Sequence, residues 1–196
     1  MTSLLALLED LVVAEFTTRD LTAVQKRALP SDVDTPTVDV ARRLLDALAA
    51  VQNKKPQKVY TWAGARLATH VLNATPGMTR GHTSVRTFLL QLNLLIPKLV
   101  AGSLPDAECP EFWGDLMGGD VVRIGFDGDE EVAWLVEGAV GAMAAHFGEQ
   151  VEITRGSAKA THTERRLIDV LAVSKSRVSS RPISAPRGLS SAGFRG

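Results

Sequence analysis

The chain has 196 residues, 45% of them hydrophobic and 22% charged, which is typical of a single globular domain with a hydrophobic core. Its 22 basic and 22 acidic residues cancel, but the charges are unevenly distributed. From Ser174 onward the chain carries no acidic residue, so the part before it is acidic by the same amount as the tail is basic. The basic residues of the tail are Lys175, Arg177, Arg181, Arg187 and Arg195.

Cysteine usage and hydropathy argue against a disulfide-bonded protein and against a membrane-spanning one. Cys109 is the only cysteine, so no internal disulfide can form, and a reducing, cytoplasmic location is expected. No stretch reaches the roughly 18 consecutive apolar residues of a membrane-spanning helix. The apolar segment 1–13 is interrupted by Glu9 and Asp10 and has no basic segment before it, so we interpret it as a first helix and not as a signal peptide.

The first half of the chain is predicted to be helical. Residues 75–81 are rich in proline and glycine and are predicted to form a loop. A later helix is predicted over 84–100, with Ser84 as its N-cap. Before the loop, apolar residues at helical spacing predict helices over 3–16, 18–28, 39–51 and 57–73.

Strand patterns begin at residue 112. Two segments that flank Gly118 and Gly119 predict a β-hairpin, over 112–117 and 120–126. Asp129 is predicted to cap a helix that ends near Phe147. Two further strands are predicted over 150–155 and 165–173.

The order of elements predicts an α+β fold. An N-terminal helical subdomain precedes a C-terminal subdomain with an antiparallel sheet of about four strands, in the order β-β-α-β-β. We expect one domain over 1–173, divided into a helical subdomain at 1–60 and a sheet subdomain at 61–173. The basic tail at 174–196, rich in Ser, Arg, Pro and Gly, is expected to be disordered.

The helix predicted over 84–100 is apolar on two sides. One side carries a leucine-rich stripe, and Leu90, Leu94 and Pro97 lie on nearly the opposite side. Such a helix is buried between two layers, or lies between a core and a cavity, and periodicity alone does not choose between them. Pro97 removes the hydrogen bond to the Asn93 carbonyl, at a cost of about 3 kcal/mol in a helix interior, so we expect a kink or an early end there.

Several strings, in their order and spacing, resemble the haem nitric oxide/oxygen-binding (H-NOX) family of sensor domains. They span roughly 3–172 and read LLEDLVVAEF, WAGARL, FLLQLNLLIP, LPDAECPEF and LVEGAVGAMAAHFGEQVEI. WAGARL departs from the family's Phe-Gly-Arg helix. The resemblance implies that helices and sheet enclose a pocket, with an axial histidine on the helix over 84–100 and a proline at a fixed interval after it. Pro110 matches that proline, which places the axial position at Pro97.

A second family motif, Tyr-x-Ser-x-Arg, clamps the haem propionates and corresponds here to Phe126, Gly128 and Glu130. The resemblance therefore implies that the axial ligand and all three clamp groups have been lost, with a carboxylate at Glu130 where the family has a cation. We predict that the chain has no haem or other cofactor. The former pocket is expected to be lined by Leu90, Leu94 and Pro110.

An alternative keeps the haem and replaces its ligand. His70 lies on the helix that forms the distal wall of the family's pocket and is the candidate substitute, against the simpler interpretation of a polar or packing histidine. No metal-site spacing is present, and no phosphate-binding loop, nucleophile elbow or paired carboxylates indicate an enzyme. We assign no site to His82, His146 and His162.

We therefore expect a cytoplasmic sensory or regulatory domain of the bacterial H-NOX type, without enzyme activity. It would bind a small apolar ligand in the former haem pocket or act through protein contacts. The resemblance implies a histidine kinase or a cyclic-dinucleotide enzyme as partner. No nucleic-acid or membrane partner is expected, because the tail lacks interleaved aromatic residues. The alternative is a haem-binding sensor of NO or O2 that uses a non-standard ligand such as His70.

Overall fold

The computed structural model describes residues 23–24, 38–95, 111–159 and 164–173. No helix in these ranges is long and apolar enough to cross a membrane. The predicted α+β class is confirmed. The elements are α3 (Val38–Val51), α4 (Pro56–Ala74), a 3-10 helix η1 (Pro76–Thr79), α5 (Val85–Leu89), β1 (Phe112–Leu116), β2 (Val121–Asp127), α7 (Glu130–His146), β3 (Gln150–Lys159) and β4 (Glu164–Val173).

The four strands form one antiparallel sheet in the order β1-β2-β4-β3, so the last strand lies between two earlier ones. The β1–β2 hairpin turns at Gly118 and Gly119, whose φ angles of 98° and 59° lie in the left-handed region that glycine adopts without steric cost. Alternate residues of β2 and β4 form the buried face of the sheet, and the central ones are at most 1% exposed: Val122, Ile124, Ile168 and Val170.

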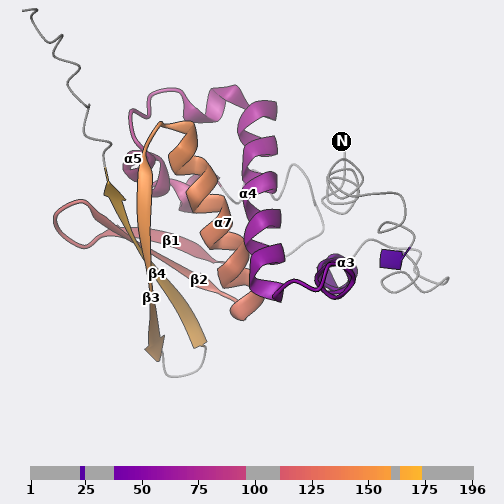
Figure 1. Ribbon diagram of the computed structural model, residues 1–196. Helices are drawn as coiled ribbons and strands as arrows, with labels where there is room; N and C mark the ends of the chain where they lie inside the picture. Colours follow the sequence, from indigo (N-terminus) through magenta and orange to yellow (C-terminus); the bar gives the residue numbers. More distant parts are fainter. Residues whose placement is uncertain (1–22, 25–37, 96–110, 160–163, 174–196) are drawn as a thin grey trace, which may run out of the picture.

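The helices cover this buried face. α7 packs on β3 and β4, and α4 packs along α7 on the side away from the sheet (Figure 1). α3 in turn packs against α4. The cavity described below is therefore bordered by elements from both halves of the chain.

Two hydrophobic clusters form the core, and α4 contributes to both. Near the end of α4, Leu72 packs with α5, α7 and the sheet. Near its start, Val59, Tyr60 and Ala63 pack with α3. The predicted boundary between residues 60 and 61 thus falls inside one continuous helix, which joins the two clusters instead of separating them.

The helix predicted over 84–100 is divided. Ser84 caps α5 as predicted, since its hydroxyl accepts a hydrogen bond from the Thr87 N–H at 3.3 Å. However, α5 ends at Leu89, and a turn precedes the helical residues 92–95. β1 comes close to this turn, because a Cβ on Gly114 would lie 2.9 Å from the Leu89 carbonyl oxygen.

The remaining element predictions divide into those confirmed and those outside the described residues. The helices over 39–51 and 57–73, the hairpin, the helix capped by Asp129 and the last two strands are confirmed, although β3 continues to Lys159. The loop predicted over 75–81 contains η1. The helix predicted over 3–16, the kink at Pro97 and the tail lie outside the described residues. Of the helix predicted over 18–28, only residues 23 and 24 are described, and they are helical.

Candidate functional site

An apolar cavity of about 280 Å³ lies between α4, α5, α7 and β1. None of its described lining side chains carries a nitrogen or oxygen atom. The lining residues of α4 are Gly64, Leu67, Ala68, Val71 and Leu72, and those of α7 are Val132, Leu135, Val136, Ala139 and Met143. The others are Met78, Phe88, Leu92, Leu95 and Phe112.

Close contact between the two helices determines how α4 and α7 border the cavity. A Cβ on Gly64 of α4 would lie 1.9 Å from the Leu135 carbonyl oxygen, and a Cβ on Gly138 of α7 would lie 1.8 Å from the Thr61 carbonyl oxygen. No side chain of any size fits at either position, so the two backbones meet directly. From this contact, each helix turns a face of apolar residues toward the cavity.

The segment 84–95 lines the cavity with a different face from the one predicted. Phe88, Leu92 and Leu95, all in the leucine-rich stripe, line the cavity. Leu94 is instead 60% exposed, and Leu90 packs against the edge of the core cluster. The physical reason is that the stripe turned toward α4 and α7 carries both the core and the cavity contacts. Pro97 and Pro110 lie outside the described residues.

The first two clamp positions are filled by contacts within the chain. Phe126 is 1% exposed, and its ring stacks on Phe112, with 5.7 Å between ring centroids and 22° between planes. Because Phe112 lines the cavity and is the cross-strand partner of Phe126, Phe126 supports that wall from the neighbouring strand. At the second position, a Cβ on Gly128 would lie 2.9 Å from the Val132 Cβ. A serine there would displace the valine, which itself lines the cavity.

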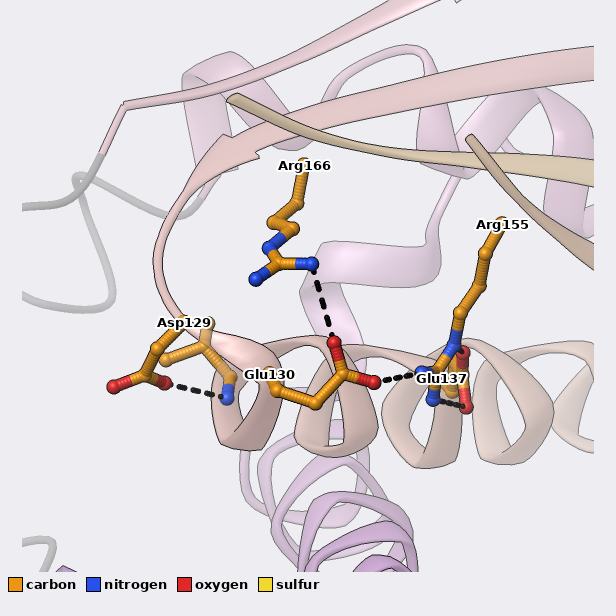
Figure 2. Close-up of polar contacts among 6 residues, drawn as sticks. Asp129, Glu130, Glu137, Arg155 and Arg166 are labelled. Carbon is orange, nitrogen blue, oxygen red and sulfur yellow. Dashed lines mark hydrogen bonds and ion pairs between the residues drawn. The ribbon is translucent and has the colours of Figure 1, made fainter. Parts of the chain in front are cut away.

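Glu130, at the third clamp position, joins an ion-pair network between α7 and the sheet (Figure 2). Its carboxylate accepts hydrogen bonds from Arg155 of β3 and from Arg166 of β4, the latter at 3.2 Å. Arg155 also donates to Glu137, two turns along α7, with 2.9 Å between Nη2 and Oε2. The hydrogen bond to Glu137, followed by attraction to both carboxylates, raises the pKa of Arg155 against the effect of its burial. The chain thus supplies its own cations to the carboxylate.

Asp129 fixes the start of α7, one residue before Glu130. Its side chain accepts a hydrogen bond from the Val132 N–H at 3.2 Å and forms an ion pair with Arg42 of α3. Burial favours the protonated carboxyl, but the Val132 N–H and the Arg42 guanidinium outweigh it and lower the pKa of Asp129. The clamp region is therefore held from α3 on one side and from the sheet on the other.

The structure does not bring His70 to the cavity. His70 lies on α4 but is exposed and is not among the lining residues. His82 packs edge-on against Phe88, with 5.4 Å between ring centroids, and His146 is exposed at the end of α7. Within the described ranges, no group of three or more His, Cys, Asp or Glu is arranged to hold a metal ion.

Four residues of this region were not identified from the sequence. Arg155 and Arg166 lie on the face of the sheet that α7 covers, opposite Ile168 and Phe126. The signal was present, because the alternation in each predicted strand places these cations inward, where the acidic start of a helix can pair with them. The lining residues Met78 and Met143 have no such signal, since methionine at helical spacing is usual in a core.

Comparisons with known proteins agree with this architecture. A model of the haem-NO-binding family matches residues 7–155, whereas no curated protein gives a significant match. The chain is similar to an H-NOX protein from S. oneidensis in the Fe(II)NO ligation state, with 15% identity, a TM-score of 0.73 and coverage of 86% of this chain and 97% of that one. It is also similar to the Fe(II) unliganded H-NOX protein from K. algicida, with 16% identity, a TM-score of 0.71 and coverage of 86% and 94%. The structural likenesses show the fold and the family model shows the membership: this chain belongs to the haem-NO-binding (H-NOX) family.

Proposed function

We propose that this sensor domain takes a small apolar ligand in the cavity in place of haem. The observation that carries the proposal is the cavity of about 280 Å³ whose described lining side chains contain only carbon, hydrogen and sulfur. A pocket of this kind favours apolar molecules, because a polar group inside it would lose its water and find no side-chain partner.

The residues around the cavity do not fit haem held in the family's manner. Haem iron is usually held by histidine, by a cysteine or tyrosine side chain, or by methionine paired with histidine. Among the described lining residues, Met78 and Met143 offer sulfur, and no histidine accompanies them. By resemblance the axial position is Pro97, whose side chain has no donor atom.

The propionate end fits no better. Phe126 and Gly128 offer no hydroxyl group, and the space beside Gly128 is taken by Val132. Glu130 is paired with Arg155 and Arg166. A propionate at this end would compete with Glu130 for the same arginines, and two carboxylates at one site repel. The network therefore supports the loss of haem binding.

The second candidate function is a haem-binding gas sensor with a substitute ligand. Membership of a haem-binding family favours it, and His70 is the candidate ligand. Its exposed position on α4, outside the set of lining residues, counts against it. The two functions differ in one measurable quantity, the amount of haem bound per chain.

The deciding experiment is expression with ample haem, followed by pyridine haemochrome analysis and an absorption spectrum. We expect far less than one haem per chain and no Soret band. A haem-binding H-NOX protein expressed in parallel controls for the haem supply. A ratio near one would overturn the proposal, and a His70→Ala variant would then show whether His70 supplies the axial bond.

H-NOX domains often act with signalling partners such as kinases, and we extend this to the present chain. We propose that ligand occupancy is passed to a histidine kinase or a cyclic-dinucleotide enzyme in the cytoplasm, and that the domain itself performs no catalysis. No nucleic-acid or membrane partner is proposed. The rate of kinase autophosphorylation, measured with and without this domain, tests the proposal. An unchanged rate for every kinase whose gene neighbours that of this domain would contradict the proposal.

A further inference from the structure

The cavity has a composition that points to a class of ligand. Besides aliphatic residues, its lining holds two phenylalanines, Phe88 and Phe112, and two methionines, Met78 and Met143. Aromatic rings and thioether sulfurs share one property: each makes a more favourable contact with an aromatic ring than an aliphatic group of the same size does.

Both rings are held in place by contacts with neighbouring rings. Phe88 packs edge-on against His82 and lies 5.7 Å from Phe147, centroid to centroid, at 50° between planes. Phe112 stacks on the buried ring of Phe126. Because these neighbouring rings pack against them, the two phenylalanines present fixed surfaces to the cavity, and binding against them costs little ordering of side chains.

The sulfur atoms complement these fixed walls. The Thr75 hydroxyl lies 2.9 Å from the Met78 sulfur, which locates that end of the side chain. Met143 is partly buried and packs against the core cluster. Unbranched methionine side chains adapt to the outline of a ligand, and their sulfurs favour the edge of an aromatic ring.

The size of the cavity and the absence of charge from its described lining narrow the class of ligand further. A dry apolar cavity of about 150 Å³ is enough to bind benzene, so about 280 Å³ accommodates one ring with substituents or two fused rings. A carboxylate on the ligand would find no cation, because the described lining residues include none. Arg155 and Arg166 do not line the cavity and are paired with Glu130 and Glu137.

We propose that the cavity binds an uncharged aromatic molecule of one or two rings, between the rings of Phe88 and Phe112 and the sulfurs of Met78 and Met143. This inference rests on the proposed function, in which the cavity is the ligand site. It adds that aromatic molecules are preferred over saturated molecules of the same size, and neutral molecules over anions.

Three small probes test the class. NMR titrations of the full chain with toluene, its saturated counterpart methylcyclohexane and its carboxylate counterpart benzoate give three dissociation constants. We expect toluene to bind roughly tenfold more tightly than methylcyclohexane and benzoate to give no binding. Equal affinity for toluene and methylcyclohexane would overturn the aromatic preference while leaving an apolar ligand site intact. Benzoate binding as tightly as toluene would overturn the charge rule, and failure of all three probes would overturn the proposed function itself.

Variants locate the binding and isolate the sulfur atoms. The Met78→Leu/Met143→Leu double variant conserves volume, and it should reduce the preference for toluene to roughly twofold while methylcyclohexane binding persists. Ala139→Leu fills the cavity and should weaken toluene binding at least roughly tenfold, whereas Ala145→Leu, on the exposed face of the same helix, should leave it unchanged. Undiminished toluene binding in Ala139→Leu would place the ligand elsewhere. If Ala139→Leu does not fold, the double variant still decides the role of the sulfurs.

Discussion

Gly138 of α7 lies so close to Thr61 of α4 that a Cβ on it would stand 1.8 Å from the Thr61 carbonyl oxygen. The contact exists because residue 138 has no side chain. On the same helix, Gly141 has open space where its Cβ would be. The two glycines therefore separate the effect of helix contact from the effect of helix propensity.

Replacing Gly138 by alanine should lower the free energy of unfolding by about 1–3 kcal/mol, because the backbones of α4 and α7 must move apart. Gly141→Ala should raise it by up to about 1 kcal/mol, since alanine favours a helix more than glycine does. Urea unfolding of the two variants measures the difference. Equal effects would mean that the close contact of the helices is not required for stability.

Replacing Glu130 by arginine should destabilise the domain more than replacing it by glutamine. Glutamine removes an attraction, worth about 0.5–1 kcal/mol for partly exposed pairs. Arginine in addition places a third cation beside Arg155 and Arg166. Urea unfolding at low and high salt checks this, because salt screens both the lost attraction and the added repulsion, so the larger deficit of the arginine variant should shrink more than that of the glutamine variant. Glu152→Gln, at an exposed position on β3, is the control. A Glu130→Arg variant as stable as the unaltered protein would contradict the network.

Asp169 should make stability depend on pH below about 4. The Arg123 Nε and Nη2 atoms donate to its two carboxylate oxygens at 2.6 and 2.8 Å, and these hydrogen bonds, against a smaller effect of burial, lower the pKa of Asp169. A carboxyl group with a lowered pKa stabilises the fold above its unfolded pKa of about 3.9 and loses this contribution as the pH falls through the folded value. Asp169→Asn should thus be less stable than the unaltered protein at pH 7, and the gap should narrow in acid.

Unfolding in urea at pH 7 and at about pH 3 measures that gap. Glu152→Gln serves again as the control, because it removes a carboxylate from an exposed position of the same sheet. A gap between Asp169→Asn and the unaltered protein that stays constant with pH would show that the pair with Arg123 does not form in solution.

Restoring a histidine at Pro97 should not by itself recover tight haem binding. The propionates would still meet Glu130 and lack a clamp, forgoing about 1.5–3 kcal/mol for each charge-assisted hydrogen bond. Adding Gly128→Ser and Glu130→Arg should therefore improve haem affinity more in the Pro97→His background than the same two changes do in the unaltered protein. The serine must also displace Val132, so the triple variant should be the least stable.

Haem titrations of the single, double and triple variants measure this coupling directly, and urea unfolding measures its cost in stability. A Pro97→His variant that binds haem as tightly as the triple variant would show that Phe126, Gly128 and Glu130 do not occupy the clamp positions.

The sequence predicts the elements well where local signals agree. For α7, the Asp129 cap, the acidic first turn and the apolar spacing all predict one helix, and for the hairpin the pair Gly118-Gly119 does the same. The face that lines the cavity could not be predicted. Leu94 and Leu92 are equally apolar, and only the packing of α4 and α7 decides that Leu92 is buried and Leu94 is exposed. The partners of Glu130 depend on the strand order, which no local pattern encodes.

The position of β4 between β2 and β3 has a consequence for how the domain is made. The only described link between the first hairpin and β3 within the sheet is β4. The edges of β2 and β3 that face β4 therefore cannot be paired until residues 164–173 have emerged from the ribosome. Until then the hairpin and β3 present unpaired backbone groups to other chains. The closing step joins residues far apart in sequence, as in the pairing of Val122 with Val170, and such long-range closure is slow. During synthesis, aggregation therefore competes with insertion of a single strand.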